Sequence, residues 1–157
     1  MLSKGESDQS KLRSAVIEKS SANSFMNAKS EWDLIKIYED ESHCVCGHFI
    51  VDNCVIRNRI TGKILIIGNT CLRQFEVAAL DVPKNAFDSL KRVREKPAAT
   101  KASPALLEVA VRCNTISQRQ SDIYNDIFHS GRQGTRSRKQ KLLKAEINDK
   151  LIRGLSR

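Results

Sequence analysis

The chain has 157 residues, the usual size of one domain, and with 29% charged but only 5% aromatic residues its core must be modest and mainly aliphatic. No apolar run is longer than the four residues 64–67, and the first residues lack the apolar stretch of a secretory signal. We therefore expect neither a membrane-spanning segment nor export, and we predict a cytoplasmic protein.

The net charge of +9 is unevenly distributed. Residues 1–83 carry 10 Lys/Arg against 11 Asp/Glu, whereas residues 84–157 carry 17 against 7. Such an asymmetry favours a polyanionic partner, either nucleic acid or an acidic protein surface, although many basic stretches are simply solvated faces.

The first predicted elements are a tail and a short helix. Residues 1–24 are rich in Ser, Lys and Glu and have one small apolar cluster, so we expect a mobile tail. From Met26 to about Tyr38, apolar residues recur at helical spacing, which predicts a helix with Trp32 on its buried face, followed by an acidic turn.

A β-hairpin is predicted for residues 54–67, because β-branched residues flank Thr61-Gly62-Lys63 and Gly62 can adopt the positive φ of a tight turn. Residues 48–51 are a candidate third strand. Asn69-Thr70 offers a cap for a helix that continues through Cys71 to about Leu80.

Helices are predicted for the rest of the chain. Residues 84–96 place Phe87, Leu90 and Val93 on one side, and residues 97–103 look like a linker. Three further helices are marked by Ser103-Pro104 and by two capping-box patterns, Ser117-x-x-Gln120 and Ser137-x-x-Gln140. Their apolar positions predict a shared packing core rather than a cofactor pocket.

Four of the five cysteines fall between positions 44 and 71, a pattern that favours a metal site in a reducing compartment over a disulfide framework. We predict a structural Zn²⁺ site formed by Cys44, Cys46, Cys54 and Cys71. Residues two apart in an extended segment point to the same side, so Cys44 and Cys46 can reach one ion, with Gly47 relieving the turn. The alternative is four buried free thiols.

Position along the chain also bears on Cys71 and on the neighbouring histidines. Cys71 would lie in the first turn of a helix, where unpaired amide groups favour the thiolate that binds zinc. His43 and His48 are possible substitutes for Cys54. Cys113 lies on the helical apolar stripe and is interpreted as a packing residue.

Several motifs extend this cysteine pattern, and together they resemble those of small zinc-ribbon-like proteins of phages, prophages and bacteria. They are Glu31-Trp32, Cys44-x-Cys46-Gly47, Cys54-x-Ile56-x-Asn58-x-x-Thr61-Gly62 and Ile67-Gly68-Asn69-Thr70-Cys71-x-x-x-Phe75. The resemblance covers roughly residues 28–153, and it implies a metal module with attached helices in a phage or bacterial cytoplasm. It brings no reaction with it, and the single residue between Cys44 and Cys46 departs from the two usual in treble-clef modules.

The basic half predicts a function in nucleic-acid binding. From His129 onward, nine Lys/Arg face two acidic residues, and cations crowd the start of the last helix, where the helix dipole disfavours them. An external polyanion would relieve this repulsion, chiefly through phosphate contacts. The predicted nucleic-acid-binding residues are Arg57, Arg59, Arg136, Arg138, Lys139, Lys141 and Lys144.

We therefore predict an α+β fold: residues 25–96 as a treble-clef or zinc-ribbon-like β-hairpin module with flanking helices, and residues 104–157 as a basic helical region. The predicted function is that of a non-enzymatic, zinc-stabilised nucleic-acid-binding accessory protein of phage or prophage origin. The alternative is an adaptor or inhibitor that docks on an acidic host enzyme. No catalytic triad, phosphate-binding glycine loop or paired carboxylates favour an enzyme or a small-molecule substrate.

Overall fold

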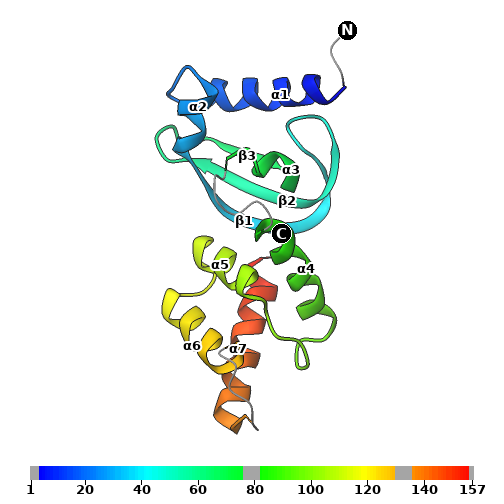
Figure 1. The fold of residues 1–157 in the computed structure, drawn as a ribbon, viewed down its shortest axis with the longest axis vertical. Helices are drawn as coiled ribbons and strands as arrows, with labels where there is room; N and C mark the ends of the chain where they lie inside the picture. Colours follow the sequence, from blue (N-terminus) through cyan, green and yellow to red (C-terminus); the bar gives the residue numbers. More distant parts are fainter. Residues whose placement is uncertain (1–3, 76–81, 130–135, 156–157) are drawn as a thin grey trace. The chain divides into compact units, whose positions relative to one another are not determined.

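The structure, a computed structural model, describes residues 4–75, 82–129 and 136–155. The fold is α+β, as predicted, and it divides into two compact units, Met1–Leu80 and Asp81–Ser156 (Figure 1). Within the described residues, no helix has the length and apolar character needed to cross a bilayer.

The N-terminal unit is built on a three-stranded antiparallel sheet in the order β1-β2-β3. Its middle strand, β2, pairs with both neighbours, and Cys54 lies opposite Ile37 of β1 and Ile67 of β3. The elements of this unit are α1 (Lys4–Glu18), α2 (Phe25–Ala28), the 3-10 turn η1 (Lys29–Glu31), β1 (Trp32–His43), β2 (Phe49–Asn58), β3 (Ile64–Ile67) and α3 (Asn69–Leu72).

The predicted hairpin at residues 54–67 is confirmed. Gly62 has φ +72°, and the N–H of Gly62 donates to the carbonyl of Asn58 at 3.0 Å. The candidate strand at residues 48–51 is the beginning of β2 rather than a strand of its own. The predicted continuation of the following helix to Leu80 lies outside the described residues beyond Phe75.

The prediction of a helix from Met26 to Tyr38 is wrong for most of its length, because Trp32–His43 is a strand. A β-bulge explains the error. The prediction rests on the helical spacing of Trp32, Ile35 and Tyr38. The register of β1 shifts between Leu34 and Lys36, so Leu34 and Ile37 are buried and Ile35 is only partly so.

The expected mobile tail also differs from the structure, since Lys4–Glu18 forms helix α1. Leu12 and Val16, one helical turn apart, are both fully buried. Burying two such side chains contributes roughly 1.5–3 kcal/mol each, which offsets part of the entropy cost of ordering the segment. Helix α1 lies next to α2 at one side of the sheet (Figure 1).

The C-terminal unit contains only helices among its described residues, and the three predicted helix starts at Ser103, Ser117 and Ser137 are confirmed as N-caps. Both predicted capping boxes are present. The helices are α4 (Val82–Glu95), α5 (Pro104–Arg112), α6 (Gln118–Phe128) and α7 (Arg138–Gly154).

The boundary between the units falls before α4, not after it as expected. The segment 97–103 is therefore no interdomain linker, because it is held inside the helical unit. Ala102 is fully buried and its N–H donates to the Tyr124 hydroxyl at 2.9 Å, and the Asn148 amide donates to the carbonyls of Pro97 and Thr100.

Candidate metal centre

The turn that joins β1 to β2 presents the first two cysteines. The Cys44 N–H donates to the His48 carbonyl at 2.9 Å, and the Gly47 N–H donates to the Cys44 carbonyl at 2.8 Å. Gly47 has φ +99°, a backbone conformation that residues other than glycine rarely adopt. This tight turn places Cys44 and Cys46, both buried, on the same side of the chain.

The third cysteine, Cys71, comes from the short helix α3. The backbone packs closely just before the helix, because a Cβ atom on Gly68 would lie only 3.0 Å from Cγ2 of Ile50 at the beginning of β2. The placement of Cys71 near the beginning of a helix agrees with the sequence-based expectation.

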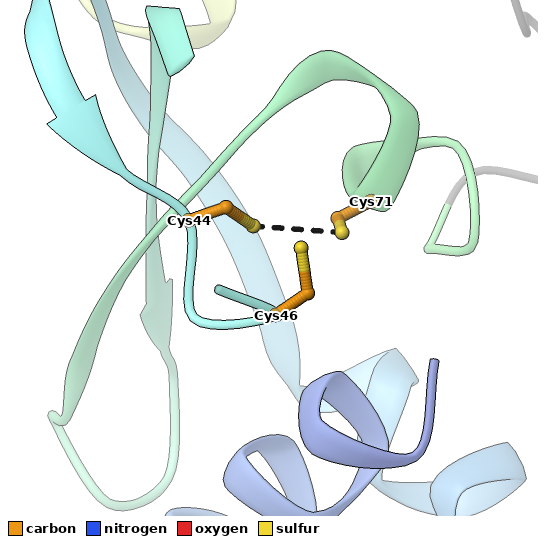
Figure 2. Close-up of side chains that lie close together, drawn as sticks. All are labelled: Cys44, Cys46 and Cys71. Carbon is orange, nitrogen blue, oxygen red and sulfur yellow. Dashed lines mark hydrogen bonds between the residues drawn. The ribbon is translucent and has the colours of Figure 1, made fainter. Parts of the chain in front are cut away.

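The sulfur atoms of Cys44, Cys46 and Cys71 all lie within 4.8 Å of one another, and all three side chains are buried. The Sγ atoms of Cys44 and Cys71 are 3.5 Å apart, too far for the S–S bond of about 2.05 Å in a disulfide. Figure 2 shows the three sulfurs pointing toward one another from the turn and from α3. Three buried cysteines in this arrangement could hold a metal ion.

The protonation of the three thiols is unequal. The hydrogen bond between the sulfurs of Cys44 and Cys71 lowers the pKa of Cys44 to about 5 and raises that of Cys71. The pKa of Cys46 is raised, mainly because burial disfavours the charged form. Without a cation, the group therefore stabilises one thiolate at the expense of the others, whereas a divalent ion favours the thiolate of every ligand.

Cys54, the fourth predicted ligand, does not belong to this group of sulfurs. It is fully buried in the middle of β2, and its Sγ lies 3.6 Å from Oδ1 of Asn69. Cys54 lies five positions after Phe49, the beginning of the strand, a path of roughly 17 Å at the usual rise per residue. The structure therefore brings three of the four predicted ligands together.

His48 and Asp8 lie beside the sulfur group. Nδ1 of His48 is 3.3 Å from Sγ of Cys46, and Nε2 of the same ring is 3.1 Å from Oδ2 of Asp8 on α1. Both residues line a cavity of about 420 Å³ together with the three cysteines. The His43 ring instead packs edge-on against Phe49, with ring centroids 5.7 Å apart.

No protein family, curated protein or solved structure matches this chain. The chemistry of its residues therefore carries the functional argument.

The predicted nucleic-acid-binding residues fall in both units. Arg57 and Arg59 of the N-terminal unit are exposed, and Arg59 forms an ion pair with Asp33 at 3.4 Å and donates to the Ser30 carbonyl. In the C-terminal unit, Arg136, Lys141 and Lys144 line a cavity of about 470 Å³. Arg138 and Lys139 are exposed in the first turn of α7.

Sequence reasoning missed two residues at these sites. The sequence-based prediction places Asp8 in a tail, although it lines the cavity at the cysteines, and Lys101 in a linker, although it lines the basic cavity. The four-residue spacing of Asp8, Leu12 and Val16 is the signal that could have placed Asp8 on a helix beside buried positions.

Proposed function

We propose that this protein is a non-enzymatic, zinc-stabilised nucleic-acid-binding accessory protein of phage or prophage origin that acts in the host cytoplasm. The N-terminal unit provides the zinc site, and the C-terminal unit provides the principal surface for the nucleic acid. The observation that carries the proposal is the cavity in the C-terminal unit lined by four cationic side chains: Lys101, Arg136, Lys141 and Lys144.

Zinc is the metal that the ligands favour. Clustered thiolates select zinc, copper(I) or iron–sulfur clusters, and a closed tetrahedral site with cysteine ligands is typical of structural zinc. Cys44, Cys46 and Cys71 join a turn to a helix in a small unit whose core is aliphatic. Bound zinc would supply the N-terminal unit with folding free energy.

The basic cavity fits an anionic group. Among the described residues, no acidic side chain lines it, and the remaining lining residues are Pro97, Ala98, Phe128 and Ala145. The Lys144 ammonium donates to the Ala98 carbonyl at 3.0 Å, and the Lys101 ammonium donates to the Phe128 carbonyl at 3.4 Å. These bonds hold two of the cations at the cavity while leaving them further N–H donors.

The cations in this cavity repel one another. The pKa of Lys144 is lowered, first by burial and then by the charge of Lys101. Helix α7 begins beside them with no acidic residue in its first turn, so its N-terminal dipole adds to the positive potential. A phosphate group bound here would offset both the repulsion between the cations and the positive potential of the α7 N-terminus. This supports a polyanionic partner.

Backbone recognition is favoured over base stacking at this surface. The Phe128 ring is largely buried, and the charged groups of Arg136 and Lys144 lie 5.6 and 5.9 Å from its centroid. A nucleic-acid base would have to displace those cations in order to stack. We therefore expect phosphate contacts with little sequence selectivity.

A salt titration with a pair of matched variants tests this proposal. The double variant Lys101→Gln, Lys141→Gln removes two charges from the cavity, and Lys150→Gln, Arg153→Gln removes two from the far end of α7, where they pair with Glu146 and Asp149. We measure binding to a short mixed-sequence DNA duplex at several salt concentrations. For the cavity variant, the plot of log K against log salt should be less steep by about 0.9 for each lost phosphate contact.

The control variant should bind nearly as the original protein does. Equal losses in both variants, or no binding to duplex, single-stranded DNA or RNA at low salt, would refute nucleic-acid binding through this cavity. Retention of one acidic host protein after nuclease treatment would instead support the adaptor function.

A further inference from the structure

We infer that Nδ1 of His48 supplies the fourth ligand of the metal ion held by Cys44, Cys46 and Cys71, and that Asp8 of α1 positions the imidazole ring for this role. This inference rests on the proposed zinc site and deepens it. It assigns the ligand that three sulfurs leave open in a tetrahedral site, and it brings helix α1 into the metal centre.

Two of the distances between the candidate ligand atoms are close to those of tetrahedral zinc. Ligands at the usual zinc distances of about 2.3 Å for sulfur and 2.1 Å for nitrogen lie about 3.8 Å apart as a sulfur pair and about 3.6 Å apart as a sulfur–nitrogen pair. The Sγ atoms of Cys44 and Cys71 are 3.5 Å apart, and Sγ of Cys46 is 3.3 Å from Nδ1 of His48. Nδ1 of His48 lies outside the group of ligand atoms that are all within 4.8 Å of one another, so the exposed His48 side chain has to rotate to bring it toward the sulfurs of Cys44 and Cys71.

The second nitrogen of the ring supports the same assignment. Nε2 of His48 lies 3.1 Å from Oδ2 of Asp8, a buried oxygen that has no hydrogen-bond partner among the described residues. An ionised carboxylate only accepts hydrogen bonds, so a proton on Nε2 would satisfy this oxygen once the ring turns into line with it. The lone pair of Nδ1 is then free for a metal. Carboxylate–histidine–zinc chains of this kind are a general feature of zinc sites.

The competing ligands are less well placed. Cys54 lies within β2 and contacts Asn69, and His43 packs against Phe49. Gln74 lines the cavity, but its neutral amide is a poorer zinc ligand than imidazole or thiolate.

Helix α1 would then be coupled to the metal. Asp8 contacts His48, and Nζ of Lys11, three residues further along α1, lies 3.6 Å from the position that a Cβ atom on Gly47 would occupy. The helix thus covers the turn that carries Cys44 and Cys46 at two points. We expect metal binding to strengthen its attachment to the sheet.

X-ray absorption at the zinc edge of the full-length reduced protein tests the ligand set. We expect three sulfurs and one nitrogen for the original protein. The variant His48→Ala should lose the nitrogen and bind zinc at least tenfold more weakly in competition with a chelating dye. His43→Ala, the matched control, should change neither result. Cys54→Ala should retain three sulfurs, because Cys54 is not a ligand.

Asp8→Asn separates positioning from ligation. We expect this variant to keep the three-sulfur, one-nitrogen set while its zinc affinity falls about tenfold or more, as is usual when the hydrogen-bond partner of a ligating histidine is removed. If the number of oxygen or nitrogen ligands at zinc fell in Asp8→Asn, Asp8 would itself be a ligand. That result would overturn its positioning role.

Four sulfurs in the original protein, or an unchanged spectrum in His48→Ala, would overturn the inference while leaving the proposed zinc site intact. An original protein that binds no zinc under reducing conditions would overturn both. The two failures are therefore distinguishable in one series of samples.

Discussion

The sulfur atoms of Cys44 and Cys71 lie 3.5 Å apart, although 27 positions separate the two residues. Between them the chain forms β2, β3 and the turns that join them, so the antiparallel sheet returns the chain to the β1–β2 turn. The metal centre therefore depends on the sheet, and a metal ion bound there would in turn hold the turn and α3 together.

Replacement of Cys44 or Cys71 by serine should remove zinc and destabilise the N-terminal unit. Serine is a poor zinc ligand, and metal-binding free energy contributes to folding, so we expect the free energy of unfolding to fall by more than about 3 kcal/mol. Zinc content by native mass spectrometry and denaturant unfolding measure the two effects. Cys113→Ser, in the C-terminal unit, is the control and should keep the full zinc content. Unchanged metal content and stability in both cysteine variants would contradict the zinc site.

Metal removal should loosen one unit and leave the other unchanged. After treatment with a strong chelator, we expect faster amide hydrogen exchange in α1, in the turn at residues 44–48 and in α3, because the ion joins these segments. Exchange in α5 and α6 of the C-terminal unit should stay as it was. Uniform acceleration across both units, or none in α1, would be inconsistent with the proposed centre.

Acid should weaken the N-terminal unit through Glu31. The Ser21 hydroxyl at 2.7 Å and the Asn58 amide at 2.7 Å donate to its carboxylate, and these bonds lower its pKa from 4.5 to about 2. Because the folded pKa lies below the unfolded value, the stabilisation is complete above about pH 4.5 and is lost as the pH falls toward 2. We expect the stability difference between the original protein and Glu31→Gln to shrink across this range.

Both the original protein and Glu31→Gln would lose bound metal at low pH. The effect of that loss on stability therefore cancels in the difference between them. Glu41→Gln, at an exposed position of β1, is the matched control and should differ from the original protein by a constant amount. A pH-independent difference for Glu31→Gln would contradict the lowered pKa.

The C-terminal unit should depend on a buried hydroxyl. The Tyr124 hydroxyl accepts from the Ala102 N–H at 2.9 Å and donates to Oδ1 of Asn148 at 3.0 Å. Tyr124→Phe leaves both partners buried without this bond, so we expect a loss of about 1–3 kcal/mol in denaturant unfolding. Gln118→Ala, which removes an exposed hydrogen bond to Asp122, should change stability by less than about 0.5 kcal/mol. Similar values for the two variants would argue against the buried network.

Local patterns predicted the elements whose signals lie within a few residues. The N-caps at Ser103, Ser117 and Ser137 and the turn at Gly62 occur where the sequence places them. Each depends on a side chain and a backbone group at most three positions apart, or on the φ of one residue. Such features form in nearly the same way in any fold that contains them.

Strand β1 and helix α1 depended on partners that a local pattern does not contain. The bulge after Leu34 in β1 exists only because β2 lies beside it. Helix α1 buries only a few apolar side chains, and its stability comes from packing rather than from the propensity of its residues. Reading either segment alone therefore led to the wrong element.

The sequence by itself determined that the chain is α+β, that cysteines cluster between positions 44 and 71, and that the basic charge gathers in the second half. Only the tertiary structure decided which sulfurs meet. Cys44, Cys46 and Cys71 converge at one end of the sheet, whereas Cys54 lies within the middle strand. The physical reason is strand register. The pairing of the strands decides which residues lie near the β1–β2 turn and α3, and the spacing of cysteines in the sequence does not encode that pairing.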